Sequence, residues 1–231
     1  MINVALVGNP NTGKTTVFNA LTGSKQYVGN WPGVTIDKKY GFINKDIKIV
    51  DLPGIYAMDT YSNEEKVSKA YLENEDVDLI INVVDATNLE RNLYLTTQLM
   101  QFNKPILVLL NMMDIANKRG LNIDTEILAK KFGVRILPIS AKNKTGLENI
   151  TKEINKSKEI IPNYNIKFNN ENEAYSYISK IIKESSKSKG KSNYIGEKID
   201  KIVLNPILAY PAFLIALFLI FKLHLVGLDS L

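Results

Sequence analysis

The sequence predicts an α/β fold in which a mostly parallel sheet carries helices on both faces. Apolar runs of strand length alternate with helical patterns along residues 1–155, and this alternation is typical of βα units. A glycine-rich loop follows the first apolar run directly, at the point where a strand would pass into a helix. Apolar residues make up 45% of the 231 positions, which is ample for a core of this kind.

The expected strands are short apolar runs, and their ranges are 2–7, 46–50, 79–84, 105–110 and 135–139. The runs at 79–84 and 105–110 are apolar throughout, which predicts strands covered on both faces near the centre of a parallel sheet. The expected helices have helical apolar patterns, and they cover 64–73, 92–101 and 124–132, with a further helix starting at 16–21.

The loop at residues 8–15 fits the pattern G-x-x-x-x-G-K-[ST]. A strand, this loop and a helix in that order would surround a phosphate with backbone N–H groups. Lys14 is expected to reach the β- and γ-phosphates and the Thr15 hydroxyl to bind Mg²⁺. An ordinary βα turn is the alternative, and the complete match disfavours it. The expected phosphate-binding residues are Gly8, Asn9, Pro10, Asn11, Thr12, Gly13, Lys14, Thr15 and Thr16.

A second group of phosphate-site residues follows the strand at 46–50. Asp51 is expected to hold Mg²⁺ and the Gly54 N–H to approach the γ-phosphate, because glycine lets the backbone come close. One threonine between Lys14 and Asp51 should also bind Mg²⁺. The candidates are Thr16, Thr22 and Thr35. Thr35 is favoured, because its loop contains glycine and proline and can order and disorder; Gly33 and Val34 are expected beside the nucleotide with it.

Two motifs at successive strand ends indicate guanine. In residues 111–114 the Asp114 carboxylate can accept hydrogen bonds from guanine N1–H and the exocyclic amine, a donor pair that adenine lacks. Met112 stands where N-[KT]-x-D has Lys or Thr, and Asn111 is expected to tie the loops together. In the Ser140-Ala141-Lys142 motif, the Ala141 backbone N–H is expected to donate to guanine O6 and Lys142 to lie beside the base.

The composition changes after about residue 155. A helix at 173–185, a basic loop at 185–192 and a short helix at 195–203 predict a small all-α domain over 156–203. The uncharged run at 206–221 is apolar on all faces and predicts a hydrophobic C-terminal helix that starts a transmembrane region over 204–231; a buried core helix is the alternative. The lysine-rich stretch before it suits a cytoplasmic flank, although nucleic acid or a solvated face would also explain it.

Composition narrows the function further. The net charge is modest at +5, and the absence of cysteine excludes disulfides. No signal peptide is expected, because the first residues already belong to a strand. A single histidine and no cysteine give no support for an iron site in this chain.

Together these motifs resemble the small GTPase fold, and more narrowly the N-terminal cytosolic part of the ferrous iron transport protein B family. The resemblance rests on residues 8–15, 29–35, 51–56, 62–67, 82–93 and 111–114. It implies a P-loop GTPase domain (the G domain) over 1–155, a helical regulatory domain like a GDP dissociation inhibitor over 156–203, and the start of the membrane region over 204–231.

The resemblance also implies a function. The chain would bind GTP, hydrolyse it slowly and regulate a multi-pass Fe²⁺ transporter from the cytoplasmic face of the inner membrane. Its partners would be guanine nucleotide and the remaining membrane domain; self-association through the helical and membrane regions is left open, and nucleic acid is not expected. The alternatives are a soluble potassium-dependent GTPase of ribosome assembly or RNA modification, and a GDP-bound module without turnover.

Hydrolysis would proceed without two familiar groups. Ile55 stands where Ras-like proteins place a water-orienting Gln, so backbone groups near Thr35 and Gly54 are expected to hold the water, and Ile55→Ala should leave turnover nearly intact. No arginine lies between residues 16 and 50. Resemblance to potassium-activated GTPases implies instead a K⁺ ion bound by Asn11 and by the carbonyls of Gly29 and Trp31. The expected catalytic residues are Lys14, Thr35, Gly54 and Asn11.

Overall fold

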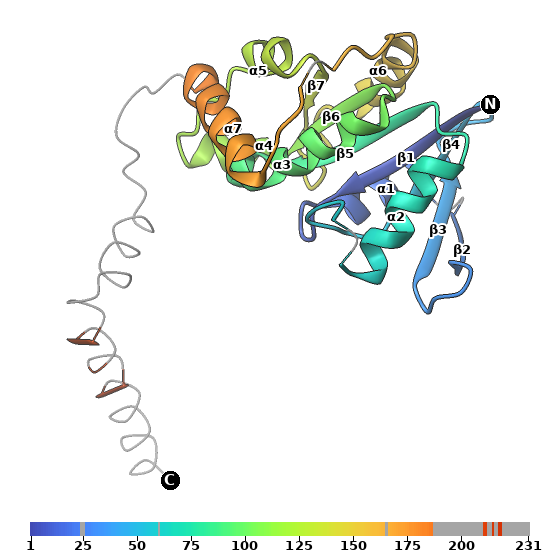
Figure 1. Ribbon diagram of the computed structural model, residues 1–231, viewed down its shortest axis with the longest axis horizontal. Coiled ribbons are helices and arrows are strands. Elements are labelled where there is room, and N and C mark those ends of the chain that lie inside the picture. Colours follow the sequence, from blue (N-terminus) through green and yellow to red (C-terminus); the bar gives the residue numbers. More distant parts are fainter. Residues whose placement is uncertain are drawn as a thin grey trace. The chain divides into compact units, whose positions relative to one another are not determined.

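The computed structural model describes residues 1–23, 26–59, 61–164 and 166–186, and the single positions 210, 211, 214, 217 and 218. Within this part of the chain a seven-stranded sheet has the order β2-β3-β4-β1-β5-β6-β7 (Figure 1). The strands are β1 Ile2–Gly8, β2 Gln26–Asn30, β3 Asp37–Phe42, β4 Ile47–Asp51, β5 Leu79–Asp85, β6 Ile106–Asn111 and β7 Arg135–Pro138.

The parallel strands of the sheet agree with the strands predicted from the sequence. β1 pairs in parallel with β4 on one side and β5 on the other, and β5, β6 and β7 continue in parallel. These are the expected strands, with ends that shift by about a residue. Because parallel strands end at one edge, the loops after β1, β4 and β6 meet there and bring the predicted motifs together.

Strands β2 and β3 were not predicted, and they make one edge of the sheet antiparallel. Both are largely exposed or half-buried and lack a run of apolar residues, so the sequence has no strand pattern there. They pair from Gln26 with Gly41 to Asn30 with Asp37. The predicted loop around Thr35 is therefore limited to residues 31–36, which connect the two strands.

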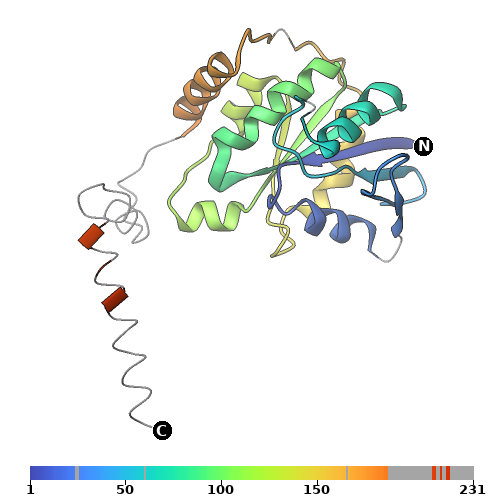
Figure 2. The same cartoon turned by 60° about the horizontal axis from the view of Figure 1, so that its bottom comes forward.

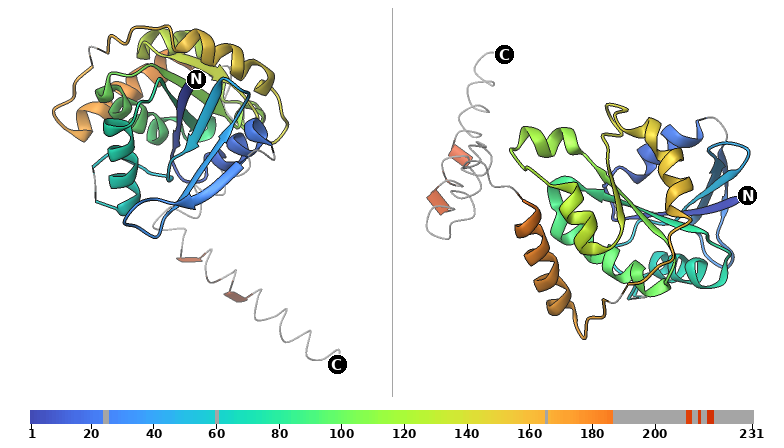
Figure 3. Two further views of the ribbon diagram at one scale, coloured as in Figure 1. Left: turned by 90° about the vertical axis from the view of Figure 1, so that its right-hand side faces the viewer. Right: turned by 90° about the horizontal axis from the view of Figure 1, so that it is seen from above.

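Helices cover both faces of the sheet. They are α1 Lys14–Thr22, α2 Asn63–Asn74, α3 Leu89–Leu99, α4 Met113–Lys118, α5 Thr125–Phe132, α6 Ile150–Ser157 and α7 Glu171–Ser185. Apolar residues of α1 and α6 pack in one core cluster, whereas those of α2, α3, α5 and α7 pack in the other. Figures 2 and 3 show the helices on the two sides of the sheet. The sequence had not predicted α4 or α6.

Side-chain caps explain where several helices begin. The Ser62 hydroxyl accepts from the Glu65 N–H while the Glu65 carboxylate accepts from the Ser62 N–H, which is a complete capping box at α2. At α5 the Asp124 side chain accepts from the Ile127 N–H, and at α7 the Asn170 side chain accepts from the Glu173 N–H. The capping box fixes the start of α2, which lies across a cavity from residues 33–36.

Helix α7 is the described part of the predicted helical domain, and it packs on α3 and α5. The ring of Tyr175 stacks on that of Tyr94 in α3 with centroids 5.0 Å apart. The Asp124 N–H before α5 donates to the Ser185 carbonyl at 2.8 Å. The expected helix at 195–203 lies outside the described residues.

The chain divides into two units, Met1–Lys189 and Gly190–Leu231, and every strand and helix named above belongs to the first. The predicted transmembrane region at 204–231 lies outside the described residues, apart from the five single positions. Among the residues that are described, no helix has the length and apolar character to cross a bilayer.

Candidate nucleotide-binding site

The loop after β1 has the backbone of a phosphate loop. The Thr12 hydroxyl donates to the Asn9 carbonyl at 2.9 Å and closes a tight turn. Gly13 has φ 83°, and a Cβ there would lie 2.5 Å from Asn111 Nδ2. A Cβ on Gly8 would lie 2.7 Å from the Val83 carbonyl oxygen. Both glycines of the motif are therefore required by close contacts, one with β5 and one with the last residue of β6.

Lys14 and Asp51, predicted for phosphate and for Mg²⁺, pair with each other in this structure. The Lys14 ammonium donates to the Asp51 carboxylate and to the Leu52 carbonyl, the latter at 2.6 Å. The two side chains are only 11% and 7% exposed. Burial raises the pKa of the Asp51 carboxyl above its usual range, and the adjacent Lys14 ammonium opposes that rise. The two charged groups thus lie in one partly dry site beside the loop.

Asn111 lies between the phosphate loop and the loop after β7. Its Nδ2 donates to the Thr12 carbonyl at 2.9 Å, and its Oδ1 accepts from the Ala141 N–H at 2.9 Å. The side chain is 3% exposed. The Ala141 N–H, predicted for guanine O6, is thus already bonded to Asn111, so base binding would require it to be shared or exchanged.

Asp114 has a partner that the sequence did not suggest. The Ser140 hydroxyl donates to Asp114 Oδ1 at 2.8 Å. This hydrogen bond lowers the pKa of the Asp114 carboxyl, with burial opposing it. The carboxylate is therefore ionised at neutral pH and keeps its second oxygen for another donor. Met112, before it, has φ 62° and turns the chain into α4, while Lys142 is exposed beside this loop.

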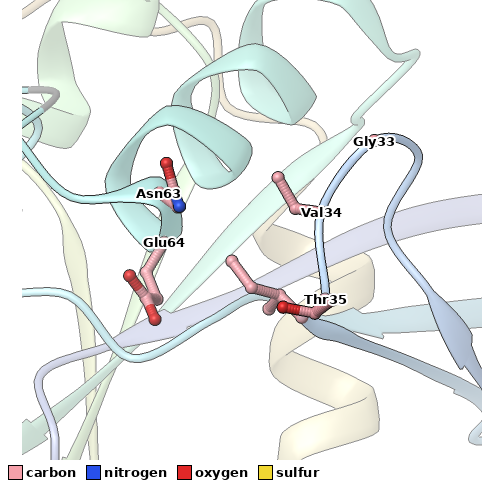
Figure 4. A pocket seen from close by; sticks show the side chains of 6 residues that line it. Gly33, Val34, Thr35, Asn63 and Glu64 are labelled. Carbon is pink, nitrogen blue, oxygen red and sulfur yellow. The ribbon is translucent and has the colours of Figure 1, made fainter.

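Thr35 lies in the segment between β2 and β3 and is exposed. With Gly33, Val34 and Ile36 it lines a cavity of about 570 Å³ whose other wall is the start of α2, at Asn63 and Glu64. Figure 4 shows the Thr35 side chain on the loop across from Glu64. Neither Thr35 nor Thr15, also exposed, makes a side-chain hydrogen bond in the described part of the chain, so both hydroxyls are available to a cation.

Gly54 and Ile55 lie against the phosphate loop in different ways. A Cβ on Gly54 would lie 3.6 Å from Pro10, and the Ile55 N–H donates to the Gly8 carbonyl at 3.3 Å. The Ile55 side chain is 2% exposed and belongs to the main core cluster. Ile55 is therefore a core residue. Ile55→Ala is expected to leave turnover nearly intact, but the mutant must be tested for stability as well.

The three predicted potassium ligands differ in their position in the fold and in their hydrogen bonds. Asn11 has φ 66°, and its exposed side chain forms no hydrogen bond within the described residues. Gly29 is within β2, opposite Lys38 of β3. The Trp31 carbonyl accepts from the Val34 N–H at 3.3 Å and keeps a second lone pair. The exposed amide oxygen of Asn11 and the carbonyl oxygen of Trp31 are ligands that suit a monovalent cation.

The hydrogen-bond network that holds the residues after Gly54 was not predicted from the sequence. Gln98 of α3 accepts from the Met58 N–H at 2.7 Å and donates to Asp59 and to the Tyr94 hydroxyl, each at 3.2 Å. Nearby, the Arg91 guanidinium lies 4.2 Å from the Tyr56 ring centroid. A buried glutamine within a helical pattern was the available signal.

Comparisons with known proteins agree with this geometry. Residues 2–154 match the family model described as ferrous iron transport protein B. The Fe(2+) transporter FeoB of Campylobacter jejuni is 38% identical over 234 residues, which cover 96% of this chain and 38% of that protein. The chain therefore spans well under half the length of that relative.

Solved structures show the same fold. The cytosolic domain of L. pneumophila FeoB superposes with a TM-score of 0.73 at 34% identity, over 80% of this chain and 100% of that one. A mutant of S. thermophilus NFeoB bound to GDP gives a TM-score of 0.70 at 46% identity, over 73% and 67% of the two chains. The sheet and its helices are those of a P-loop GTPase G domain. Because the family model matches residues 2–154, the chain belongs to the ferrous iron transport protein B family.

Proposed function

We propose that this chain binds and hydrolyses GTP and is the regulatory module of a longer Fe²⁺ membrane transporter. The relatives carry the transporter name, and the GDP in the S. thermophilus structure supports a guanine nucleotide here. The module would act at the cytoplasmic face of the inner membrane, with the membrane domain of the same protein as its partner. Residues 1–155 would form the GTPase domain, 156–203 the regulatory helices and 204–231 the start of the membrane region.

The observation that carries the proposal is the base site formed by Asn111, Asp114 and Ser140. Asn111 joins the phosphate loop to the loop that would surround the base. The Ser140 hydroxyl holds the Asp114 carboxylate in its ionised form. A fixed carboxylate selects guanine over adenine, because adenine leaves it without the paired donors.

The phosphate site provides the groups that phosphoryl transfer needs. Binding of GTP would draw the Lys14 ammonium from Asp51 to the β- and γ-phosphates, because together they carry more negative charge than one carboxylate. Asp51, Thr15 and Thr35 would then hold Mg²⁺, and the ion would neutralise charge that develops on the phosphates. Their buried carboxylate and two exposed hydroxyls suit a hard cation. Backbone groups near Thr35 and Gly54 would hold the attacking water.

Asn11 would make hydrolysis depend on potassium. Its free amide oxygen, with the carbonyls of Gly29 and Trp31, would hold K⁺ beside the phosphates, where a fixed positive charge supplies part of what an arginine finger supplies elsewhere. The described residues between 16 and 50 include no arginine that would take this role.

The test is a switch of base specificity. In Asp114→Asn the amide oxygen can still accept from guanine N1–H, but the amide NH2 faces the exocyclic amine of guanine, which is also a donor. Xanthine has a carbonyl in place of that amine, and the NH2 can donate to it. Calorimetry should show a loss of GDP affinity of about 100-fold and a gain for XDP. Unchanged GDP binding would contradict the proposed base site. Fe²⁺ uptake by cells carrying the full-length protein, with and without the same substitution, then tests the transport role.

A further inference from the structure

The indole of Trp31 joins the segment 31–36 to two other elements. Its ring meets that of Tyr71 on α2 nearly edge-on, with centroids 5.3 Å apart and an interplanar angle of 75°. The Lys38 ammonium of β3 lies 4.6 Å from the Trp31 ring centroid and 5.9 Å from that of Tyr71. The two aromatic residues are 6% and 9% exposed. Two rings and one cation thus fasten the segment to the helix that follows Gly54.

Two buried donors, one on Trp31 and one on α2, are unpaired among the described residues. The Trp31 Nε1–H has no hydrogen-bond partner in the described part of the structure, and neither has the Ser68 hydroxyl. Ser68 is one turn before Tyr71 on the same buried side of α2. Buried donors in native proteins are nearly always paired. The unpaired indole N–H therefore favours a second arrangement in which this group finds a partner or water.

The segment that the indole fastens has few backbone hydrogen bonds. Its backbone hydrogen bonds run from the Trp31 N–H to the Ile36 carbonyl at 2.9 Å and from the Val34 N–H to the Trp31 carbonyl. Gly33 has a positive φ, and Thr35 faces the cavity in front of α2. A pull on Thr35 therefore acts against a short turn, the indole contact and the half-buried side chains of Val34 and Ile36, which pack against the same core cluster.

We propose that Trp31, Tyr71 and Lys38 form a latch, which holds the 31–36 segment on α2 with GDP and releases the indole when GTP and Mg²⁺ engage Thr35. The inference rests on the proposed function, because Thr35 must sense the γ-phosphate. It gives the Trp31 side chain a role distinct from that of its carbonyl, which would bind the cation. It also couples the two segments beside the γ-phosphate through one side chain.

Trp31 is the single tryptophan of the chain, so intrinsic fluorescence reports on the latch without a label. Emission and acrylamide quenching are measured with GDP and with Mg²⁺ and a non-hydrolysable GTP analogue. We expect the analogue to shift the emission to longer wavelength and to increase quenching. Identical emission and quenching in the two states, with the analogue shown to be bound by calorimetry, would overturn the latch.

A charge-removing substitution tests the cation. Lys38→Met keeps the apolar stem but loses the ammonium, so the released fraction with GDP should rise roughly two- to five-fold. Lys48→Met is the matched control, because the Lys48 ammonium lies 5.2 Å from the Tyr40 ring centroid and does not face Trp31. The latch is wrong if the two variants give the same quenching.

The aromatic partner is tested with two variants at position 71. Tyr71→Phe keeps the ring and should leave Trp31 quenching as it was, whereas Tyr71→Leu should increase it. If Tyr71→Leu does not fold, the comparison of Lys38→Met with Lys48→Met still decides whether the latch exists. Loss of all guanine-nucleotide binding by the parent chain would refute the proposed function, whereas binding with an unresponsive Trp31 would refute only the latch.

Discussion

The Asn111 amide donates to the Thr12 carbonyl at 2.9 Å, across 99 positions of sequence. This hydrogen bond sets the distance between the phosphate loop and the base loop, because the same side chain also holds the Ala141 N–H. The spacing between the phosphate and base sites is therefore fixed by protein contacts before a nucleotide binds.

Removing this bridge should weaken nucleotide binding more than folding. Asn111→Asp keeps an acceptor for the Ala141 N–H but loses the donor to Thr12 and adds a buried charge. We expect GDP affinity to fall by about 10- to 100-fold, measured by calorimetry. Asn117→Asp, at an exposed position of α4, is the control. Equal affinities for the two variants would show that Asn111 does not set the spacing.

Ser140→Ala should move the acid limit of GDP binding. The Ser140 hydrogen bond lowers the pKa of Asp114, so its loss lets that pKa rise towards 3.8. Binding needs the carboxylate, so affinity should begin to fall at a higher pH in the mutant as the solution is acidified. Titration of GDP binding against pH measures this shift. Ser140→Thr keeps the hydroxyl and should retain the parent profile.

Asn11 should govern potassium stimulation. Hydrolysis in KCl should exceed hydrolysis in NaCl for the parent chain, and Asn11→Ala should lose the difference. Because Asn11 has φ 66°, alanine also strains the loop by about 1 kcal/mol. Asn11→Gly removes the amide without that strain and should give the same result. Potassium stimulation that survives in the glycine variant rules out Asn11 as a ligand.

Ile55 is predicted to matter for stability. Truncating this 2%-exposed side chain in Ile55→Ala should lower the free energy of unfolding by about 2–5 kcal/mol. Turnover per folded molecule should stay nearly unchanged, because the apolar side chain cannot orient water. Urea denaturation and single-turnover hydrolysis separate the two effects. A 100-fold loss of turnover in the folded fraction would contradict this view, and Ile55→Val should be the milder case.

The ion pair between β7 and α6 should give the fold a pH dependence. Arg135 donates twice to the Glu153 carboxylate, at 2.9 and 2.6 Å. Burial raises the pKa of Glu153, but hydrogen bonds from Lys156 and Arg135 outweigh it and leave that pKa below its usual value. The pair therefore stabilises the fold above the unfolded-state pKa of 4.5, and this contribution disappears as the pH falls through the folded-state pKa.

Glu153→Gln should accordingly cost about 1 kcal/mol of unfolding free energy at neutral pH and almost nothing near pH 2. Denaturant unfolding at both pH values provides the measurement. An equal loss at both would indicate packing and not charge.

The sequence predicted the parts of the fold that local pattern controls. β1, β5 and β6 are long apolar runs, and the phosphate loop is one continuous motif. The two edge strands were missed because they are exposed, and α4 was missed because its six residues are too few for a helical period. The sequence also gave no indication of the pairs Lys14–Asp51 and Asp114–Ser140, because such partners are chosen by the tertiary fold.

The β2–β3 hairpin at the antiparallel edge can move separately from the parallel strands. β2 has a neighbour on one side only, and the 31–36 segment is the turn of the β2–β3 hairpin. The hairpin is joined to the rest of the sheet by the β3–β4 pairing, so it could separate there without breaking any pairing among β4, β1, β5, β6 and β7. The nucleotide cycle would operate at the rim of the sheet, while its centre stays intact through every turnover.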